Sequence, residues 1–243
     1  MKTIVIFKWA RSPQDARVDA DGAMDWSGAR LSPNDDDPAA MALARDLTAG
    51  GEVVGLTLRD GDLAWAAARG AARTVVVTDA GQEADSGATG AVLAAGVRRI
   101  GDPDLVLIGD SAWDYGVVSA LAGQLGWPAL ANVTSAVREA GKLRVTRKLG
   151  AVTQVVEVTG PAVLAVAANR AEQHLPGMKE VLAARRKPLE KLTTAELGTN
   201  TADRVRSRGT RFPDTAAAKL FDGADPDAAV AQVVAALRTD GVL

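Results

Sequence analysis

The sequence contains no cysteine and a single histidine, His174, among its 243 residues. The absence of cysteine excludes disulfides, thiolate metal sites and cysteine nucleophiles, and it is compatible with a reducing cytoplasm. One histidine cannot form a zinc site with several imidazoles, and a serine–histidine–aspartate triad would have to use this residue. We expect no metal site, and we interpret the acidic run "NDDD" at 34–37 as a cap and solvated start for the following helix.

A strong charge of either sign and long apolar runs are also missing. The chain carries 28 Lys+Arg against 30 Asp+Glu, a formal net charge of −2. Nucleic acid or an anionic membrane as the main partner would require a concentrated basic face, so neither is expected. No run reaches the roughly 18 apolar residues of a membrane helix. We expect a cytoplasmic protein that does not insert into membranes.

The sequence lacks the common catalytic and nucleotide-binding signatures as well. It contains no GxGxxG, no Walker A sequence and no GxSxG elbow. We therefore predict no catalytic residue.

Short apolar runs alternate with alanine-rich segments through the first half of the chain. Continuous runs of this length suit parallel strands that are buried on both faces. A helix after Asp37, taken as its N-cap, has Pro38 at the first helical position. The alternation predicts an α/β fold with a doubly wound, mostly parallel sheet of the Rossmann-like type. The expected strands are 3–7, 52–58, 73–79 and 104–110.

Two segments interrupt this pattern. Residues 16–28 surround an Asp-Gly pair and predict a hairpin, and residues 131–160 alternate apolar and polar side chains with glycine turns. The second segment predicts an antiparallel meander beside the parallel strands.

The pattern lapses after about Leu189, and a last helix begins near Asp225 and Pro226. We predict a nucleotide-binding α/β domain over 1–190 and, over 191–243, a C-terminal arm whose helix packs on a partner subunit.

The segment "DLVLIGDSAWDYG" at 104–116 carries the clearest local signal of a binding site. A buried strand ends at Gly109, and a loop of small residues leads into a helix. In open α/β sheets, ligands collect at the carboxyl ends of strands, where helix N-termini offer N–H groups to phosphate. Nucleotide binding and an ordinary strand–helix loop both remain open from the spacing alone.

Taken in order, several segments resemble the β subunit of electron transfer flavoproteins. They are the strand "IVIFK", the hairpin "RVDADG", the helix and strand "AWAAARGAARTVVV", the loop "DPDLVLIGDSAWD", the segment "LAGQLGWPALANV" and the stretch "GPAVLAVAANRAEQHLPGMKEVLAARRKPLEKL". The resemblance covers nearly the whole chain. It implies an electron carrier rather than an enzyme.

In that family the β subunit forms a heterodimer with an α subunit. The two hold FAD together and pass electrons from a flavin-dependent dehydrogenase to an acceptor. The β subunit binds an adenine nucleotide, AMP in most members and a second FAD in electron-bifurcating ones. By position, the resemblance places this nucleotide at Phe7, Asn34, Leu58, Gly109, Asp110, Ser111, Ala112, Trp113, Asp114, Tyr115 and Gly116.

The resemblance also implies a loop that docks the dehydrogenase through an apolar side chain. The docking residues would be Leu175, Pro176 and Met178, with Leu175 as the anchor and Met178 or Leu182 as alternatives to it. The basic run at 185–187 is interpreted as a solvated helix face that steers an acidic partner.

This sequence departs from the family pattern in two places. The loop after Gly109 is shorter, and "NDD" stands where the family has an aromatic residue near the flavin. AMP, a second FAD and an empty site therefore stay open. A stand-alone adenine-nucleotide sensor of similar fold, without a redox role, is the alternative function.

Overall fold

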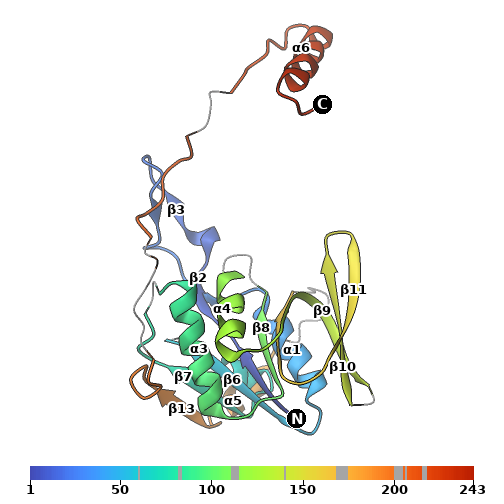
Figure 1. Cartoon of the computed structure of the whole chain (residues 1–243). Coiled ribbons are helices and arrows are strands. Elements are labelled where there is room, and N and C mark those ends of the chain that lie inside the picture. The colour runs from blue at the N-terminus through green and yellow to red at the C-terminus, as the bar shows by residue number, and fades with distance from the viewer. Residues whose placement is uncertain are drawn as a thin grey trace. The chain divides into compact units, whose positions relative to one another are not determined.

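The computed structural model describes residues 1–59, 61–81, 84–110, 115–139, 141–167, 175–199, 205, 207–214 and 218–243. The chain divides into two compact units (Figure 1). The first consists of Met1–Arg17 and Met24–Arg208, and the second of Val18–Ala23 and Gly209–Leu243. None of the helices in the described part of the chain is long and apolar enough to cross a membrane.

The first unit is built on a nine-stranded sheet with the order β11-β10-β9-β12-β8-β1-β6-β7-β13. Besides β9, six of its strands run parallel to their neighbours. Five of the six are largely apolar and form the centre of the unit, and all five residues of β8 are buried, whereas β13 lies at an edge of the sheet. The six strands are β1 (Lys2–Ile6), β6 (Glu52–Leu58), β7 (Arg73–Val77), β8 (Leu105–Gly109), β12 (Ala162–Val166) and β13 (Leu189–Leu192).

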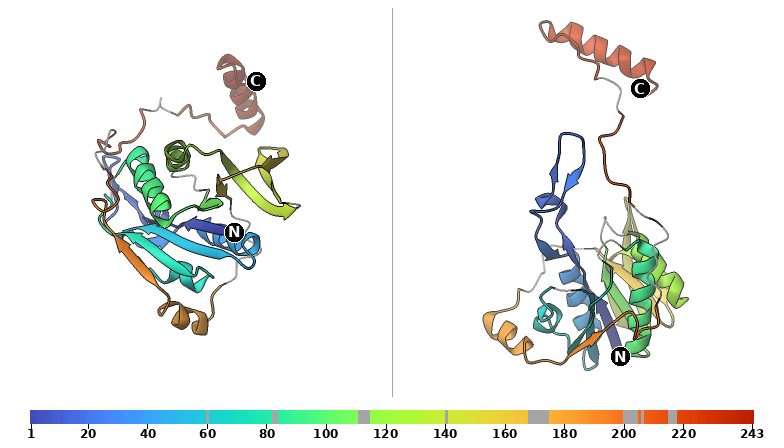
Figure 2. Two further views of the ribbon diagram at one scale, coloured as in Figure 1. Left: turned by 60° about the horizontal axis from the view of Figure 1, so that its bottom comes forward. Right: turned by 90° about the vertical axis from the view of Figure 1, so that its left-hand side faces the viewer.

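Helices cover both faces of this sheet (Figure 2). Side chains of α3 (Ser86–Ile100) and α4 (Tyr115–Leu125) join one face of the strands in the first apolar core. Side chains of α1 (Asp37–Leu47) and α2 (Trp65–Ala68) join the other face in the second core. The predicted doubly wound, mostly parallel α/β architecture is confirmed.

The predicted antiparallel meander is also present. It consists of β9 (Ala129–Glu139), β10 (Lys142–Leu149) and β11 (Val152–Val158). The meander joins the parallel strands through β9, which pairs parallel with β12. The register shifts between Leu164 and Val166, so a bulge marks this junction.

Two small sheets lie outside the main one. The first pairs β2 (Trp9–Arg11) with β5 (Leu31–Pro33), and the 3-10 helix η1 (Pro13–Asp15) follows β2. The second pairs β3 (Arg17–Val18) with β4 (Met24–Asp25), which is the predicted hairpin around Gly22.

The structure corrects three local predictions. Helix α1 begins at Asp37 with Asp36 at its N-cap, so Asp37 is not the cap; it is fully buried instead of solvated. The pattern does not lapse at Leu189, because β13 adds a parallel strand beside β7. Lys187 is not solvated either, since its ammonium donates to the carbonyls of Ala67 (3.0 Å) and Ala71 (2.7 Å).

The second unit contains helix α6 (Pro226–Thr239). Asp225 caps it as predicted, because its carboxylate accepts from the N–H groups of Asp227 (3.1 Å) and Ala228 (3.3 Å). All 14 residues of the helix are described and none of them is buried. Its apolar stripe of Val230, Val233, Val234 and Leu237 therefore lacks a covering surface within the helix's own unit.

Candidate functional site

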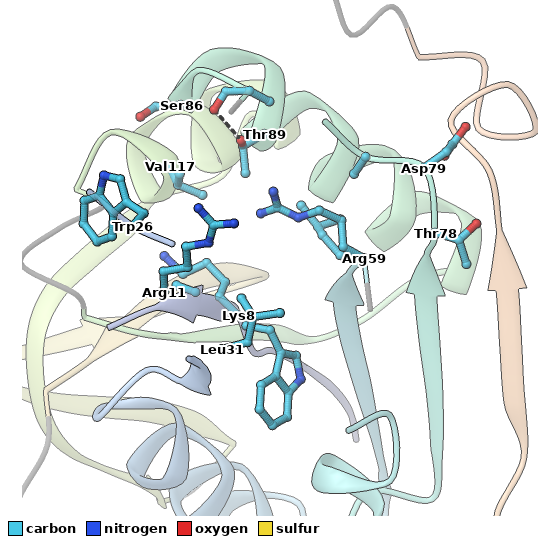
Figure 3. A pocket seen from close by; sticks show the side chains of 15 residues that line it. Lys8, Arg11, Trp26, Leu31, Arg59, Thr78, Asp79, Ser86, Thr89 and Val117 are labelled. Carbon is cyan, nitrogen blue, oxygen red and sulfur yellow. Dashed lines mark hydrogen bonds between the residues drawn. The ribbon is translucent and has the colours of Figure 1, made fainter. Parts of the chain in front are cut away.

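A cavity of about 800 Å³ opens at the carboxyl ends of the parallel strands in the first unit (Figure 3). Its floor comes from the segments that follow β1, β6 and β7. Strand β2 and Leu31 of β5 form one wall, and the first turns of α3 and α4 form the other. Ligands of open α/β sheets bind at this edge, so the topology itself favours a binding function here.

Three cationic side chains line the cavity: Lys8, Arg11 and Arg59. Figure 3 shows the guanidinium groups of Arg11 and Arg59 extending toward each other across the cavity, with Lys8 beside them. Among the residues that the structure describes, Asp79 is the one acidic side chain in the lining. Asp79 points away from these cations, because its carboxylate accepts from the N–H (2.7 Å) and hydroxyl (2.9 Å) of Thr194. The described part of the lining is therefore suited to an anion.

The backbone holds Arg59 in place. Its φ of +64° lies in the left-handed region, which side chains other than glycine rarely adopt. Its N–H donates to the carbonyl of Val77 (2.7 Å), and its guanidinium donates to the carbonyl of Gly81 (3.1 Å). A Cβ on Gly61 would lie 2.4 Å from the ring of Trp9, so only glycine lets this loop pack on the opposite wall. Left-handed conformations at such positions often accompany function.

The starts of two helices meet at the other wall. Asp85 caps α3 by accepting from the N–H of Ala88 (2.7 Å). A Cβ on Gly116 would lie 2.6 Å from the hydroxyl of Ser86, so the first turns of α3 and α4 are in close contact. Helix N-termini carry N–H groups and a partial positive charge, both favourable to phosphate. Ser86 and Thr89 add hydroxyl groups to the lining.

A buried carboxyl group lies beside the end of β8. Asp37 accepts from the backbone N–H groups of Lys8 (2.9 Å) and Asn34 (3.1 Å) through one oxygen. Its other oxygen, Oδ1, has no partner among the described residues and would lie 2.6 Å from a Cβ on Gly109. Burial, although opposed by the hydrogen bond from Lys8, raises the pKa of Asp37 to about 7. Asp37 therefore changes charge near neutral pH.

A second acid lies at the end of β8. The carboxylate of Asp110 accepts from the backbone N–H of Asn132, and burial raises the pKa of Asp110 above its ordinary value. Asn132 has a φ of +57° and lies in β9 beside the bulge. This contact fixes the end of β8 against the start of the meander.

The structure brings together only part of the predicted nucleotide site. Leu58 lines the cavity, and Gly116 lies in the first turn of α4 at the helix wall. The predicted Gly109 and Asn34 lie around Asp37, and the amide nitrogen of Asn34 is buried without a partner in the described part of the chain. The predicted Ser111, Ala112, Trp113 and Asp114 lie outside the described residues, and Tyr115 is the first residue of α4.

Phe7 has a different setting. Its ring is fully buried and stacks on Trp65, with the ring centroids 5.1 Å apart. The guanidinium of Arg69 lies 4.2 Å above the same tryptophan ring. This group packs in the core that includes α2, so contact between Phe7 and a nucleotide stays a prediction.

Sequence reasoning missed the cations of the cavity. Lys8 is the second residue after β1 and Arg59 is the first after β6, at the sheet edge where a ligand was expected. Their positions directly after predicted strands could have identified these two residues as ligand-binding candidates. Arg11 carried none, because β2 and its pairing with β5 were not predicted.

The predicted docking residues lie at the start of α5 (Met178–Ala184). The side chains of Leu175 and Met178 are 77% and 76% exposed, and Leu182 is also exposed. Pro176 is half-buried. The part of this loop at 168–174, including His174, lies outside the described residues. Exposed apolar side chains of this size are suited to a protein contact.

One comparison with known proteins bears on most of the first unit. The sequence profile of the electron transfer flavoprotein domain matches residues 24–197, more than half of the chain. The matched region contains the cavity walls from Trp26 to Val117, the meander and helix α5. The chain therefore belongs to the electron transfer flavoprotein family.

Proposed function

We propose that this chain is the β subunit of a heterodimeric electron transfer flavoprotein. With an α subunit it would hold FAD and carry electrons from a flavin-dependent dehydrogenase to an acceptor. The observation that carries the proposal is the family match over residues 24–197. The protein would be a carrier rather than an enzyme, since the redox chemistry is that of the flavin.

The residues of the cavity are compatible with an adenine nucleotide in this chain. Its cationic lining and the two helix N-termini are suited to phosphate. Leu58, Leu31 and Val117 supply apolar surface for a base or sugar, and the buried N–H of Trp9 is a donor without a partner in the described part of the chain. AMP is the proposed ligand, with a second FAD as the other member of the same class.

Helix α6 supports an association with another subunit. None of its residues is buried, and Val230 is 62% exposed. An amphipathic helix gains most of its stability when its apolar face is covered. A stand-alone nucleotide sensor would have no need of this stripe, whereas a subunit of a heterodimer would.

The test is to express the chain alone and together with a candidate FAD-binding α subunit. Each preparation is denatured, and released small molecules are identified by chromatography with mass detection. We expect AMP from the lone chain and FAD only from the complex. FAD released by the lone chain would indicate the bifurcating type. If neither ligand is released and no complex forms, the proposal is wrong.

A pair of variants on α6 makes the association part of the test specific. Val230→Asp places a charge on the apolar stripe, and Gln232→Asp places the same charge on the opposite face of the helix. We expect the first to abolish co-purification with the α subunit and the second to leave it intact. Both variants should retain the nucleotide, because the cavity lies entirely in the first unit.

A further inference from the structure

A second cavity, of about 280 Å³, lies beside the amino ends of β1, β8 and β12, at the edge of the sheet opposite the first cavity. It lies wholly in the first unit, between Met1, the start of β8 and the turns that join β9 to β10 and β11 to β12. None of its described lining residues also lines the first cavity. A ligand at this edge is therefore independent of the proposed nucleotide.

The floor of the second cavity is apolar. Leu105, Leu143 and Val158 are buried members of the core that includes α1, and the side chain of Met1 packs against the same core. The backbone holds Met1 in place, because its carbonyl accepts from the N–H of Glu52 (3.0 Å). An apolar group of a ligand that lies on this floor is removed from water, which favours binding.

Two charged side chains of opposite sign line the same cavity in the described part of the chain: Arg138 of β9 and Asp104, which directly precedes β8. Among the described residues, the guanidinium of Arg138 has one polar contact, its donation to the sulfur of Met1 (2.8 Å), and a thioether is a weak acceptor. The other guanidinium donors therefore remain for a ligand.

The acid of this pair is fixed by the backbone. Oδ2 of Asp104 accepts from the N–H of Lys2 (2.7 Å), and the N–H of Asp104 donates to the carbonyl of Lys2 (2.9 Å). Oδ1 of Asp104 has no partner within the described residues. The cavity thus combines one cation and one carboxylate oxygen, both available to a ligand, with an apolar floor.

We propose that the second cavity binds a free α-amino acid with an apolar side chain, such as leucine. Arg138 contacts the carboxylate, since a guanidinium presents a planar fork that matches two carboxylate oxygens. Asp104 contacts the ammonium group, and the floor receives the side chain. The two charges of the described lining cancel, so a zwitterion is more complementary to it than phosphate or another ion of one sign.

The size of the cavity agrees with this ligand class. Sites for drug-sized ligands have volumes of about 300–1,000 Å³. The second cavity, at about 280 Å³, lies just below that range. It therefore suits a ligand with about ten non-hydrogen atoms, the size of a free amino acid, rather than a nucleotide.

The test is a titration of the isotopically labelled full chain, followed by NMR through the amide signals of Gly141 and Gly160, which line the cavity. The probes are L-leucine, isocaproate, which lacks the ammonium group, and isoamylamine, which lacks the carboxylate. We expect leucine to shift these signals with a Kd on the order of 0.1–1 mM. Each analogue should bind about tenfold or more weakly, because it leaves one charged side chain unpaired.

Two variants assign the charged groups of the ligand. Arg138→Gln should weaken leucine binding about tenfold and change isoamylamine binding by less than about twofold. Asp104→Asn, which keeps an acceptor for the N–H of Lys2, should weaken leucine binding similarly and leave isocaproate binding unchanged or stronger. Arg144→Gln and Asp102→Asn are the matched controls, because both residues are exposed and lie outside the described lining. Urea unfolding verifies that each variant is folded.

Several outcomes would overturn the inference. No shift of the two glycine signals at about 10 mM leucine would show that the amino acid does not bind there. Equal affinity for leucine and either analogue would show that one of the two charged side chains has no role. Undiminished binding by both variants would place the ligand elsewhere. None of these results bears on the nucleotide or the α subunit, which the co-expression experiment tests separately.

Discussion

The central strands and the C-terminal helix contain similar apolar residues, but these residues are buried in the strands and not in the helix. Every residue of β8 is buried between two helical layers of its own unit. No residue of α6 is buried, although valine and leucine form a stripe along it. An apolar pattern therefore identifies a face that must be covered, but it does not identify which chain covers it.

This difference separates the stability of the folded chain from the stability of its association with another surface. The strands gain free energy from burial within one chain, at about 25 cal/mol for each Å² of apolar surface. The stripe of α6 gains comparable free energy only when a surface covers it. Substitutions in the first unit should therefore change the free energy of unfolding of the isolated chain. Substitutions in α6 should change association.

The largest expected effect comes from truncating a central strand residue. Leu107 in β8 is fully buried, so Leu107→Ala should lower the free energy of unfolding by about 2–5 kcal/mol. Leu220 in the second unit is 91% exposed, and Leu220→Ala should change it by less than about 0.5 kcal/mol. Urea unfolding of both variants measures the contrast. Equal losses would show that the two units do not differ in this way.

A smaller effect is expected where α3 packs on α4. A Cβ on Gly90 would lie 2.6 Å from the Cβ of Ala120 and 2.8 Å from the backbone nitrogen of Leu121. Gly90→Ala should therefore lower the free energy of unfolding by about 1–3 kcal/mol. Gly123 lies in α4 with nothing within 4 Å of a Cβ, so Gly123→Ala should raise it by about 0.5–1 kcal/mol. Thermal unfolding measures both changes. If the two substitutions change the free energy of unfolding in the same direction, the close packing of α3 on α4 is contradicted.

The smallest effect is a pH dependence at Asp37. Its pKa is raised from 3.8 to about 7 in the folded chain, so the folded state binds more protons than the unfolded state between these values. Stability contributed by the neutral form is therefore lost as pH rises through this window, and the loss is complete above about pH 7. Between about pH 6 and 8, the wild type should lose about 1 kcal/mol relative to Asp37→Asn.

Denaturant unfolding at several pH values measures this loss. Asp35→Asn, at an exposed position in the same acidic run, is the control and should follow the wild type. Parallel pH profiles for the wild type and Asp37→Asn would show that this carboxyl group does not titrate in the window.

The main architecture could be predicted because its elements are locally encoded. Continuous apolar runs such as β6 and β8 are buried on both faces, and glycine turns separate the strands of the meander. Strand β13 was missed because "LEKL" alternates charged and apolar residues and pairs with only one neighbour, β7. An edge strand of this kind carries too few apolar residues to stand out from a loop.

The site was less predictable because its residues come from separate segments. Arg11 and Arg59 lie in loops or short strands whose meeting depends on the β2–β5 sheet and on the contact of Gly61 with Trp9. Asp37 looked solvated because three aspartates follow one another, and only the tertiary packing of α1 on β8 buries the third. The local sequence around each residue does not show that these segments meet in the folded chain.

The position of β12 in the sheet has a consequence for how the protein is made. It lies between β8 and β9, yet it follows the whole meander in the sequence. During synthesis β9, β10 and β11 can pair with one another at once, but they can join the parallel strands only after β12 has been translated. Until then β8 presents an unpaired edge, which is a template for mispairing with other chains. The order of strands thus makes the translation of one five-residue segment the step that joins the meander to the parallel strands.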